Sequence, residues 1–329
     1  MAFLRKDKEN RASKKRGYRV YYATDLHGSD LCFRKFLAAG RVFEADAIVM
    51  GGDMTGKAIV PIRKMSRGRY VAEFQGAHEE LDESQLELFK DRVTFNGFYP
   101  WVAEESQIEN AEEDEDFQGR LFEEFMVDQA RRWTTLAADR LDDSLRCFIS
   151  PGNDDFLIID DVLREAERIE FPDKRVIEVG PLSMISIGDS NVTPWRTPRE
   201  MDETQLLKEI EDLAEPVTDG RAMMFNFHVP PHGSGLDTVN ALDPSYRPVV
   251  EHGMIAQTAA GSTAVRTAIE RYEPVVSVHG HIHEGKGLHR IGPTRCFNPG
   301  CDYSAGILQG LVLDFADSGD YLHHTFTSG

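Results

Sequence analysis

The chain has 329 residues, 41% of them hydrophobic, which is enough to bury the core of one large domain or two smaller ones. Its 37 Lys and Arg against 56 Asp and Glu give a formal net charge of -19, which argues against nucleic acid or an anionic membrane as an extended binding partner. We find no apolar run of the roughly 20 residues that span a bilayer and no secretion signal, and therefore expect a cytoplasmic protein.

The basic N-terminus and the cysteines bear on how the chain is organised. Residues 1–17 are rich in Lys and Arg and predict a basic, flexible arm, while residues 18–327 are expected to form one domain. The four cysteines form no CxxC pair. Cys296 and Cys301 could lie close in space, but we favour reduced thiols over a disulfide or a zinc clip.

The first two predicted strands both end in side chains of the metal-binding type. An aromatic and β-branched run at 18–24 ends in Asp25-Leu26-His27-Gly28, and a helix is expected at 31–39, capped by Ser29 or Asp30 and ended by Gly40. A buried strand at 46–50 then ends in Gly51-Gly52-Asp53. In both segments a strand is followed by polar side chains and then by a crossover to the next strand.

Residues 57–120 interrupt this order, and we interpret them as an insertion that forms a lid or rim beside the site. The residues from Ser84 to Glu87 match a capping box and predict a short helix. The acidic run at 104–116 is expected to be a solvated loop rather than a metal site, because nothing fixes its geometry. A helix at 117–141 follows, with its apolar residues at helical spacing.

Beyond the insertion, polar residues again follow predicted strands. A strand at 146–150 leads to Gly152-Asn153-Asp154, one at 222–227 leads to His228, and one at 274–278 leads to His279-Gly280-His281-Ile282-His283. The other expected elements are helices at 161–169 and 203–213, a helix capped by Ser262 or Thr263, hairpins at 175–188 and 287–297, and an antiparallel pair at 307–315 and 321–327. The loop at 233–260 is not assigned.

Seven side chains share this position just after a strand: Asp25, His27, Asp53, Asn153, His228, His281 and His283. Each alone has another explanation, such as a helix cap, a turn residue or a core histidine. Because the carboxyl ends of strands in an open α/β sheet converge on one crevice, we expect the set to meet there.

The ligand types indicate the metal. Carboxylate, imidazole and amide groups without thiolate suit Mn, Fe or Zn, and three or more imidazoles argue against Mg or Ca. Seven side chains are too many for one ion, whereas two divalent ions about 3.5 to 4 Å apart, bridged by one carboxylate, would use them all. Such a pair would lower the pKa of a bridging water from 15.7 to about 7.

The blocks Asp25-x-His27, Gly52-Asp53, Gly152-Asn153, His228 and Gly280-His281-x-His283 resemble, in this order, the five motifs of the calcineurin-like metallophosphoesterase superfamily, in particular its prokaryotic Icc-type phosphodiesterase-like branch. The resemblance implies a four-layer αββα sandwich of two mixed β-sheets. It assigns Asp25, His27 and His283 to one metal, Asn153, His228 and His281 to the other, and Asp53 to the bridge.

The resemblance also implies an activity. A metal-bridging hydroxide would attack phosphorus in line with the leaving oxygen, with Mn2+ expected before Fe or Zn. The expected substrate is a small-molecule phosphate ester, a phosphodiester before a monoester, and a homodimer is left open. Asn298-Pro299-Gly300 is similar to a further family block, although Cys301 stands where Ser is usual.

One departure concerns the candidate catalytic residues Asp53, Asn153 and Asp154. The family's third motif commonly reads Gly-Asn-His, and the resemblance gives that His the role of protonating the leaving oxygen; here the position is Asp154. General acids contribute roughly 10² to 10⁴ in rate, and an Asp with an ordinary pKa of about 3.9 beside two cations should be ionised.

Three interpretations of this departure follow. The enzyme favours good leaving groups or takes the proton from another residue, with His232 a candidate. The second interpretation is that Asp154 makes a hydrogen bond that fixes the loop. The third interpretation is a catalytically weakened metal-binding scaffold or regulatory subunit, with the insertion as its contact surface.

Overall fold

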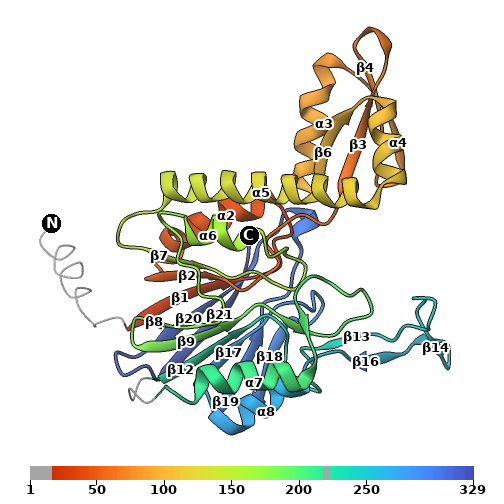
Figure 1. Cartoon of the computed structure of the whole chain (residues 1–329). Helices are drawn as coiled ribbons and strands as arrows, with labels where there is room; N and C mark the ends of the chain where they lie inside the picture. Colours follow the sequence, from red (N-terminus) through yellow and green to blue (C-terminus); the bar gives the residue numbers. More distant parts are fainter. Residues whose placement is uncertain (1–16, 218–221) are drawn as a thin grey trace, which may run out of the picture.

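The computed structural model describes residues 17–217 and 222–329, so the predicted basic arm lies outside the described residues except for Gly17. Two mixed β-sheets pack face to face at the centre, and helices cover the outer face of each (Figure 1). This arrangement confirms the predicted four-layer αββα sandwich. Of the helices that the structure describes, none is both long enough and apolar enough to cross a membrane.

The first sheet has the strand order β21-β20-β1-β2-β7. Its strands are β1 (Tyr18–Ala23), β2 (Ala47–Met50), β7 (Arg146–Ile149), β20 (Gln309–Phe315) and β21 (Tyr321–Ser328). The β1, β2 and β7 strands run parallel, whereas β20 and β21 are antiparallel additions. The three parallel strands therefore end at the same edge of the sheet.

The second sheet has the order β18-β19-β17-β12-β9-β8. Its strands are β8 (Arg175–Val179), β9 (Leu182–Ile187), β12 (Ala222–Phe227), β17 (Val276–Val278), β18 (Gly287–Ile291) and β19 (Thr294–Asn298). The β9, β12, β17 and β19 strands are parallel neighbours. Parallel strands covered on both faces are nearly continuous apolar runs, which is why these segments were recognisable from sequence.

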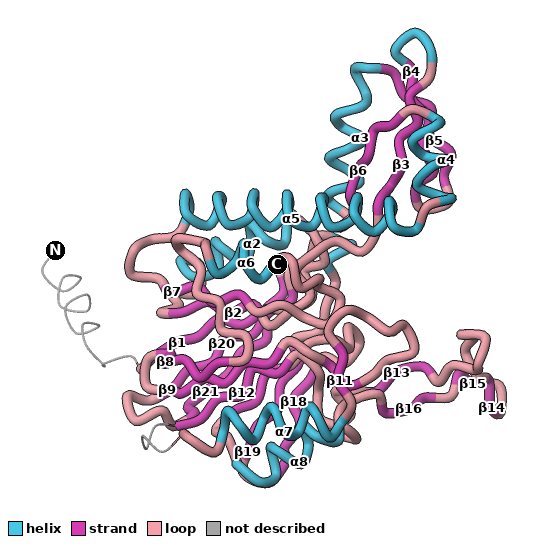
Figure 2. The backbone as a smooth tube through the Cα atoms, in the orientation of Figure 1, coloured by secondary structure: helices cyan, strands magenta, loops and turns pink. Residues whose placement is uncertain are grey.

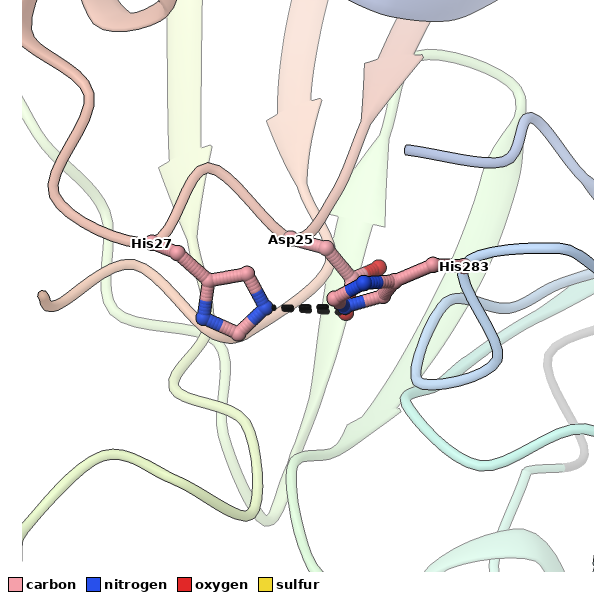
Figure 3. Close-up of side chains that lie close together, drawn as sticks. All are labelled: Asp25, His27 and His283. Atoms are coloured by element: carbon pink, nitrogen blue, oxygen red, sulfur yellow. Dashed lines mark hydrogen bonds and ion pairs between the residues drawn. The ribbon is translucent and has the colours of Figure 1, made fainter. Parts of the chain in front are cut away.

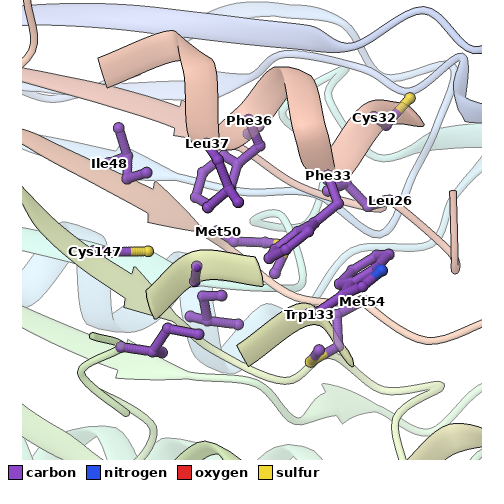
Figure 4. Close-up of a cluster of buried hydrophobic side chains, with 14 of the residues drawn as sticks. Leu26, Cys32, Phe33, Phe36, Leu37, Ile48, Met50, Met54, Trp133 and Cys147 are labelled. Carbon is purple, nitrogen blue, oxygen red and sulfur yellow. The ribbon is translucent and has the colours of Figure 1, made fainter. Parts of the chain in front are cut away.

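Three hydrophobic layers hold the sandwich together. Side chains such as Val20, Phe148 and Met224 fill the space between the sheets. On the outside of the first sheet, Phe33 of α2 (Asp30–Val42) stacks on Trp133 of α5 (Glu115–Arg140) at a ring-centroid distance of 4.1 Å (Figure 4). The helices α7 (Glu203–Ala214) and α8 (Thr263–Tyr272) cover the second sheet.

The insertion is a compact α/β unit that projects from the sandwich (Figures 1 and 2). Its sheet has the order β5-β4-β3-β6. The elements are β3 (Ile59–Lys64), β4 (Arg69–Phe74), β5 (Ala77–Asp82), β6 (Tyr99–Ala103), α3 (Glu83–Phe95) and α4 (Glu105–Glu113), with a 3₁₀ turn at Ser66–Gly68. It has its own core, in which Phe74 packs against Phe89.

Two predictions inside the insertion are wrong. The acidic run is not a loop, because Glu104 and Gln107 form a capping box and Ile108 and Ala111 supply a buried face for α4. The cap of α3 is Asp82 rather than Ser84, with Gln85 completing the box. The capping box of α3 begins two residues before the predicted one, and that of α4 lies inside the acidic run itself.

Two helices on the sandwich also end differently from their predicted bounds. Gly40 does not end α2, which continues to Val42. A Cβ at position 40 would lie 2.2 Å from the Leu145 side chain, so the glycine allows close packing there. The helix α6 (Ile159–Arg164) is shorter than predicted, because the chain leaves it to bring Glu170 beside Phe148 of β7.

The unassigned loop forms an arm that extends from the sandwich (Figure 2). It contains the antiparallel pairs β13 (Thr238–Asn240) with β16 (Gln257–Ala259) and β14 (Val250–Glu251) with β15 (Met254–Ile255). Short pairing of β10 (Ser190–Asn191) with β11 (Glu200–Met201) and a 3₁₀ turn at Tyr303–Ala305 complete the fold.

A buried hydrogen-bond network fastens the insertion to the sandwich. Gln129 of α5 donates from Nε2 to the Gly28 carbonyl over 2.8 Å. Its Oε1 accepts from the Tyr99 hydroxyl at 2.9 Å and from the Gly56 amide at 3.3 Å. The insertion is thus held against the loop that follows β1.

Candidate metal centre

The polar residues predicted from the strand ends lie at one edge of the sandwich. Asp25 and His27 follow β1, Asp53 follows β2, and Asn153 follows β7. From the second sheet, His228 follows β12, and His281 and His283 follow β17. Because the parallel strands of both sheets end at this edge, residues up to 258 positions apart in sequence come within a few ångströms of one another.

Asp25, His27 and His283 form the first group (Figure 3). The Nε2 atoms of the two histidines are 2.9 Å apart. The Asp25 Oδ1 atom is 3.6 Å from His283 Nε2 and 3.9 Å from His27 Nε2. Three donor atoms therefore face a common point, as the ligands of one ion must.

Asp53 lies between this group and His228. Its Oδ2 is 3.7 Å from His27 Nε2 on one side and 3.4 Å from His228 Nε2 on the other. His228 Nε2 is also 3.9 Å from Asp25 Oδ1. The carboxylate of Asp53 therefore lies within 4 Å of a ring nitrogen of both histidines.

Asn153 and His281 lie next to His228. His281 Nδ1 is 2.6 Å from Asn153 Oδ1, and the His281 ring lies edge-on to that of His228 at 5.4 Å. The Asn153 amide is oriented because its Nδ2 donates to Thr197 Oγ1 at 2.9 Å and to Asp154 Oδ1 at 3.0 Å. The Asn153 oxygen is consequently the atom turned toward the centre.

The chemistry of the donors fits a metal. His228 Nδ1 is 3.0 Å from the Gly51 carbonyl, which accounts for the proton on Nδ1 and leaves Nε2 as the atom that faces the two carboxylates. That Nε2 atom is buried and has no hydrogen-bond partner among the described residues. The two carboxylates favour a positive charge at this position, and a divalent ion bound to Nε2 in place of its proton would supply one.

The backbone at the centre is strained. Asp25, His27, Asp53 and His281 adopt positive φ angles of 56°, 41°, 50° and 66°. Such conformations cost of order 1 kcal/mol or more for residues with a side chain, and they concentrate at functional sites. The strain turns these four side chains inward from the strand ends.

The charges of the centre are interdependent. Burial alone would raise the pKa of Asp25 and Asp53, but the neighbouring histidines hold both pKa values below the usual range. Burial opposes protonation of His228, yet Asp53 and Asp25 outweigh it and raise its pKa to about 10. Burial lowers the pKa of His27 and brings that of His281 to about 4. The centre thus carries two ionised carboxylates and at least two neutral imidazoles.

Asp154, the departure from the family motif, lies beside a lysine. Its Oδ2 is 3.3 Å from Lys57 Nζ, its amide donates to Asp53 Oδ1, and its Oδ1 accepts from Asn153. Burial and the charge of Asp53 raise its pKa to about 6, although Lys57 opposes this. These contacts match the loop-fixing interpretation.

Three residues that support the centre were not predicted from the sequence. Lys57 is a lone cation four residues after Asp53, a spacing that carries no general signal. Asp155 is buried and accepts from the amides of Gly152, Met54 and Thr55, which fastens the Asp53 loop to the Asn153 loop. Thr197 comes from the segment between β10 and β11, remote in sequence from Asn153.

Two other histidines are placed apart from the centre. His232 has a half-exposed side chain with its Nδ1 3.9 Å from Asp237, and it does not line the pocket, so the structure does not support it as a proton donor. His279 is fully buried with Nδ1 close to the carbonyls of Phe227 and Val229, which agrees with a structural role.

A cavity of about 660 Å³ opens above the centre. Asp53, Asn153, His281 and His283 form its floor, and Lys57 and Asp154 line it as well. The wall includes Trp195 and residues of the arm such as Thr238, Asn240 and Leu242. The size is within the range of small-molecule sites.

Comparison with known proteins gives distant similarities. No family model matches the chain. An uncharacterised protein of Methanocaldococcus jannaschii is 26% identical over 162 residues, which are 48% of this chain, and the chain spans 66% of that protein's length. A crystal structure with 15% sequence identity covers 95% of this chain and 98% of its own, with a TM-score of 0.54.

Phosphoesterases occur among the other similar solved structures. An archaeal phosphodiesterase is 11% identical, with 94% of this chain and 99% of that chain covered and a TM-score of 0.30. A phosphoesterase from E. coli is 10% identical, with 93% and 98% covered and a TM-score of 0.30. These solved structures are all less than 25% identical to the chain, and the first of them shows that the chain shares its fold.

Proposed function

We propose that this protein is a metal-dependent hydrolase of phosphate esters. Asp25, His27 and His283 would hold one divalent ion, Asn153, His228 and His281 a second, and Asp53 both. The observation that carries the proposal is the convergence of these side chains from five separate strand ends, with His228 Nε2 buried beside the carboxylates of Asp25 and Asp53. When bound, a pair of divalent ions supplies an activated water and a charge for the phosphoryl oxygens.

The residues of the chain support this chemistry around the ions. Gly51 holds the His228 tautomer, and Thr197 with Asp154 orients the Asn153 amide. Lys57 presents its ammonium group to the cavity, where it can hold a phosphate oxygen by a charge-assisted hydrogen bond. The donor set is compatible with Mn2+, Fe or Zn, and we take Mn2+ first.

We take a diester before a monoester on the ground of space. The cavity of about 660 Å³ is large enough for a phosphate with two substituents.

Paired assays test the proposal. The purified protein, stripped of metal and reloaded with Mn2+, should hydrolyse bis(4-nitrophenyl) phosphate faster than 4-nitrophenyl phosphate at equal concentration. His228→Ala and Asp53→Asn should both reduce turnover by at least about a hundredfold, since each removes a proposed ligand. Full turnover by either variant would refute the assignment.

One observation favours the second candidate, a catalytically weakened metal-binding scaffold or regulatory subunit. Asp154 occupies the position of the expected proton donor, and the only histidines that line the cavity among the described residues are His281 and His283. Tight Mn2+ binding without turnover of the activated diester would establish this candidate. Asp154→His should then restore measurable hydrolysis.

A further inference from the structure

A second cavity, of about 440 Å³, lies between the insertion and the N-terminal half of α5. We call it the apolar chamber. Its wall is formed by Ile59, Trp101, Ile108, Ala111, Leu121 and Phe156. These residues come from β3, β6, α4, α5 and the loop after β7, so both the insertion and the sandwich contribute to it.

The apolar chamber adjoins the cavity above the metal centre. Lys57 and Phe122 line both cavities. The Lys57 ammonium lies at the metal-centre end, 3.3 Å from Asp154. A substituent of a phosphate bound at the centre would therefore enter the chamber if it extended past Lys57.

The wall at this junction is fixed by packing. The Phe122 ring meets the rings of Tyr99 and Phe156 edge to face, each at 5.7 Å. Tyr99 in turn donates to Gln129, whose other contacts reach the loop after β1. These contacts thus connect the chamber wall to the loop after β1, which carries Asp25 and His27.

The chemistry of the lining indicates what kind of group binds. Its charged residues apart from Lys57 are Glu112 and Glu115, both exposed at the rim. The deeper wall is aliphatic and aromatic, and it offers few hydrogen-bonding groups to a sugar or a charged group. A hydrophobic substituent is the group that such a lining binds most favourably.

We propose that the apolar chamber binds an aryl or alkyl substituent of the phosphate ester, so that the substrates of this protein are esters of hydrophobic alcohols or phenols. The inference rests on the proposed function, because the phosphate must occupy the metal centre. It assigns substrate selection to the insertion, through Trp101, and leaves the chemistry to the sandwich.

Gly119 provides a variant that fills the chamber. It lies in α5 on the chamber wall, and a Cβ built there has no atom within 4 Å, so Gly119→Trp can project into open space. Replacing a helical glycine also favours the helix. Leu88→Trp on the exposed face of α3 is the matched control, because Leu88 is 75% exposed and outside the chamber.

Binding of two non-hydrolysable probes to the Mn2+-loaded protein tests the inference by calorimetry. Benzylphosphonate should bind wild type and Leu88→Trp about tenfold or more tightly than methylphosphonate, the discrimination expected of a hydrophobic pocket. In Gly119→Trp this preference should disappear while methylphosphonate binds as before. Equal affinity of the two probes for wild type, or a preference retained in Gly119→Trp, would overturn the inference.

Turnover of bis(4-nitrophenyl) phosphate, measured in parallel, separates the two proposals. If wild type prefers benzylphosphonate but does not hydrolyse the diester, the proposed role of the apolar chamber is supported and the proposed phosphoesterase activity is refuted. If wild type hydrolyses the diester but does not prefer benzylphosphonate, only the proposed role of the apolar chamber is refuted. That role is also refuted if neither probe binds wild type.

Discussion

Thr197 offers a sharp test of how the metal centre is organised, because it touches no proposed metal and yet orients a ligand. Its Oγ1 accepts a hydrogen bond of 2.9 Å from Asn153 Nδ2 and donates one of 2.8 Å to Glu200. Thr197→Val keeps the shape of the side chain and removes both bonds. Thr197→Ser keeps the hydroxyl and is the matched control.

The expected loss of Mn2+ affinity in Thr197→Val follows from the hydrogen bonds of Asn153. The bond from Asn153 Nδ2 to Asp154 remains in Thr197→Val, so the amide is loosened rather than freed. The loss of one neutral hydrogen bond costs about 1 kcal/mol, which corresponds to a roughly fivefold change in affinity, and hydrogen-bond partners of metal ligands typically contribute 10- to 100-fold. We therefore expect Mn2+ affinity to fall about tenfold in Thr197→Val and to stay within about twofold of wild type in Thr197→Ser.

Competition with a metal-binding dye gives the assay, since it measures the affinity of each ion separately from turnover. Only one of the two ions should be affected, because Asn153 is proposed to bind one. If Thr197→Val binds both ions as wild type does, the hydrogen bond does not orient Asn153 and the reasoning fails. Equal weakening of both ions would contradict the assignment of Asn153 to one of them.

Three further predictions follow from the same structure. Removal of metal by a chelator should lower the melting temperature, because an ion that binds only the folded chain stabilises it; Mn2+ should restore it in wild type and not in Asp53→Asn, as differential scanning fluorimetry would show. Trp133→Ala should cost about 3 to 5 kcal/mol in urea unfolding, since the ring is buried and stacked on Phe33; a loss below about 1 kcal/mol would contradict this packing. Burial raises the pKa of Asp173 to about 6, so between about pH 4 and pH 6 the folded protein keeps a proton that the unfolded chain releases, and the free energy of unfolding falls as pH rises through this range. Relative to Asp173→Asn, wild type should lose about 3 kcal/mol of stability over this range. Parallel pH profiles of the free energy of unfolding for the two proteins would refute the shift.

The sandwich and its metal-type residues could be predicted from sequence for one physical reason. Strands such as β2, buried on both faces, are continuous apolar runs, and the polar residue that ends each run is conspicuous. Asp53 and His228 were found in this way. The interpretation of Asp154 as a loop-fixing residue was likewise one of the alternatives read from the sequence.

The elements and contacts that were not predicted have weaker signals in the local sequence. The strands of the insertion are half exposed: β5 has one buried residue, Leu81, among charged neighbours, and its pairing with β4 is not visible in composition. The charge of the acidic run concealed the buried pair of Ile108 and Ala111. Contacts between remote residues, such as those of Lys57 with Asp154, have no pattern in a single sequence.

The position of β1 between β2 and β20 has a consequence for synthesis of the protein. Tyr18 at the start of the chain pairs in register with Phe315 near its end, and Asp25 needs His283 beside it. During synthesis β1 therefore has β2 beside it but lacks β20, and Asp25 lacks His283, until these later residues have been made. Contacts so distant in sequence slow folding, so we expect the proposed ions to bind only after the two sheets have come together.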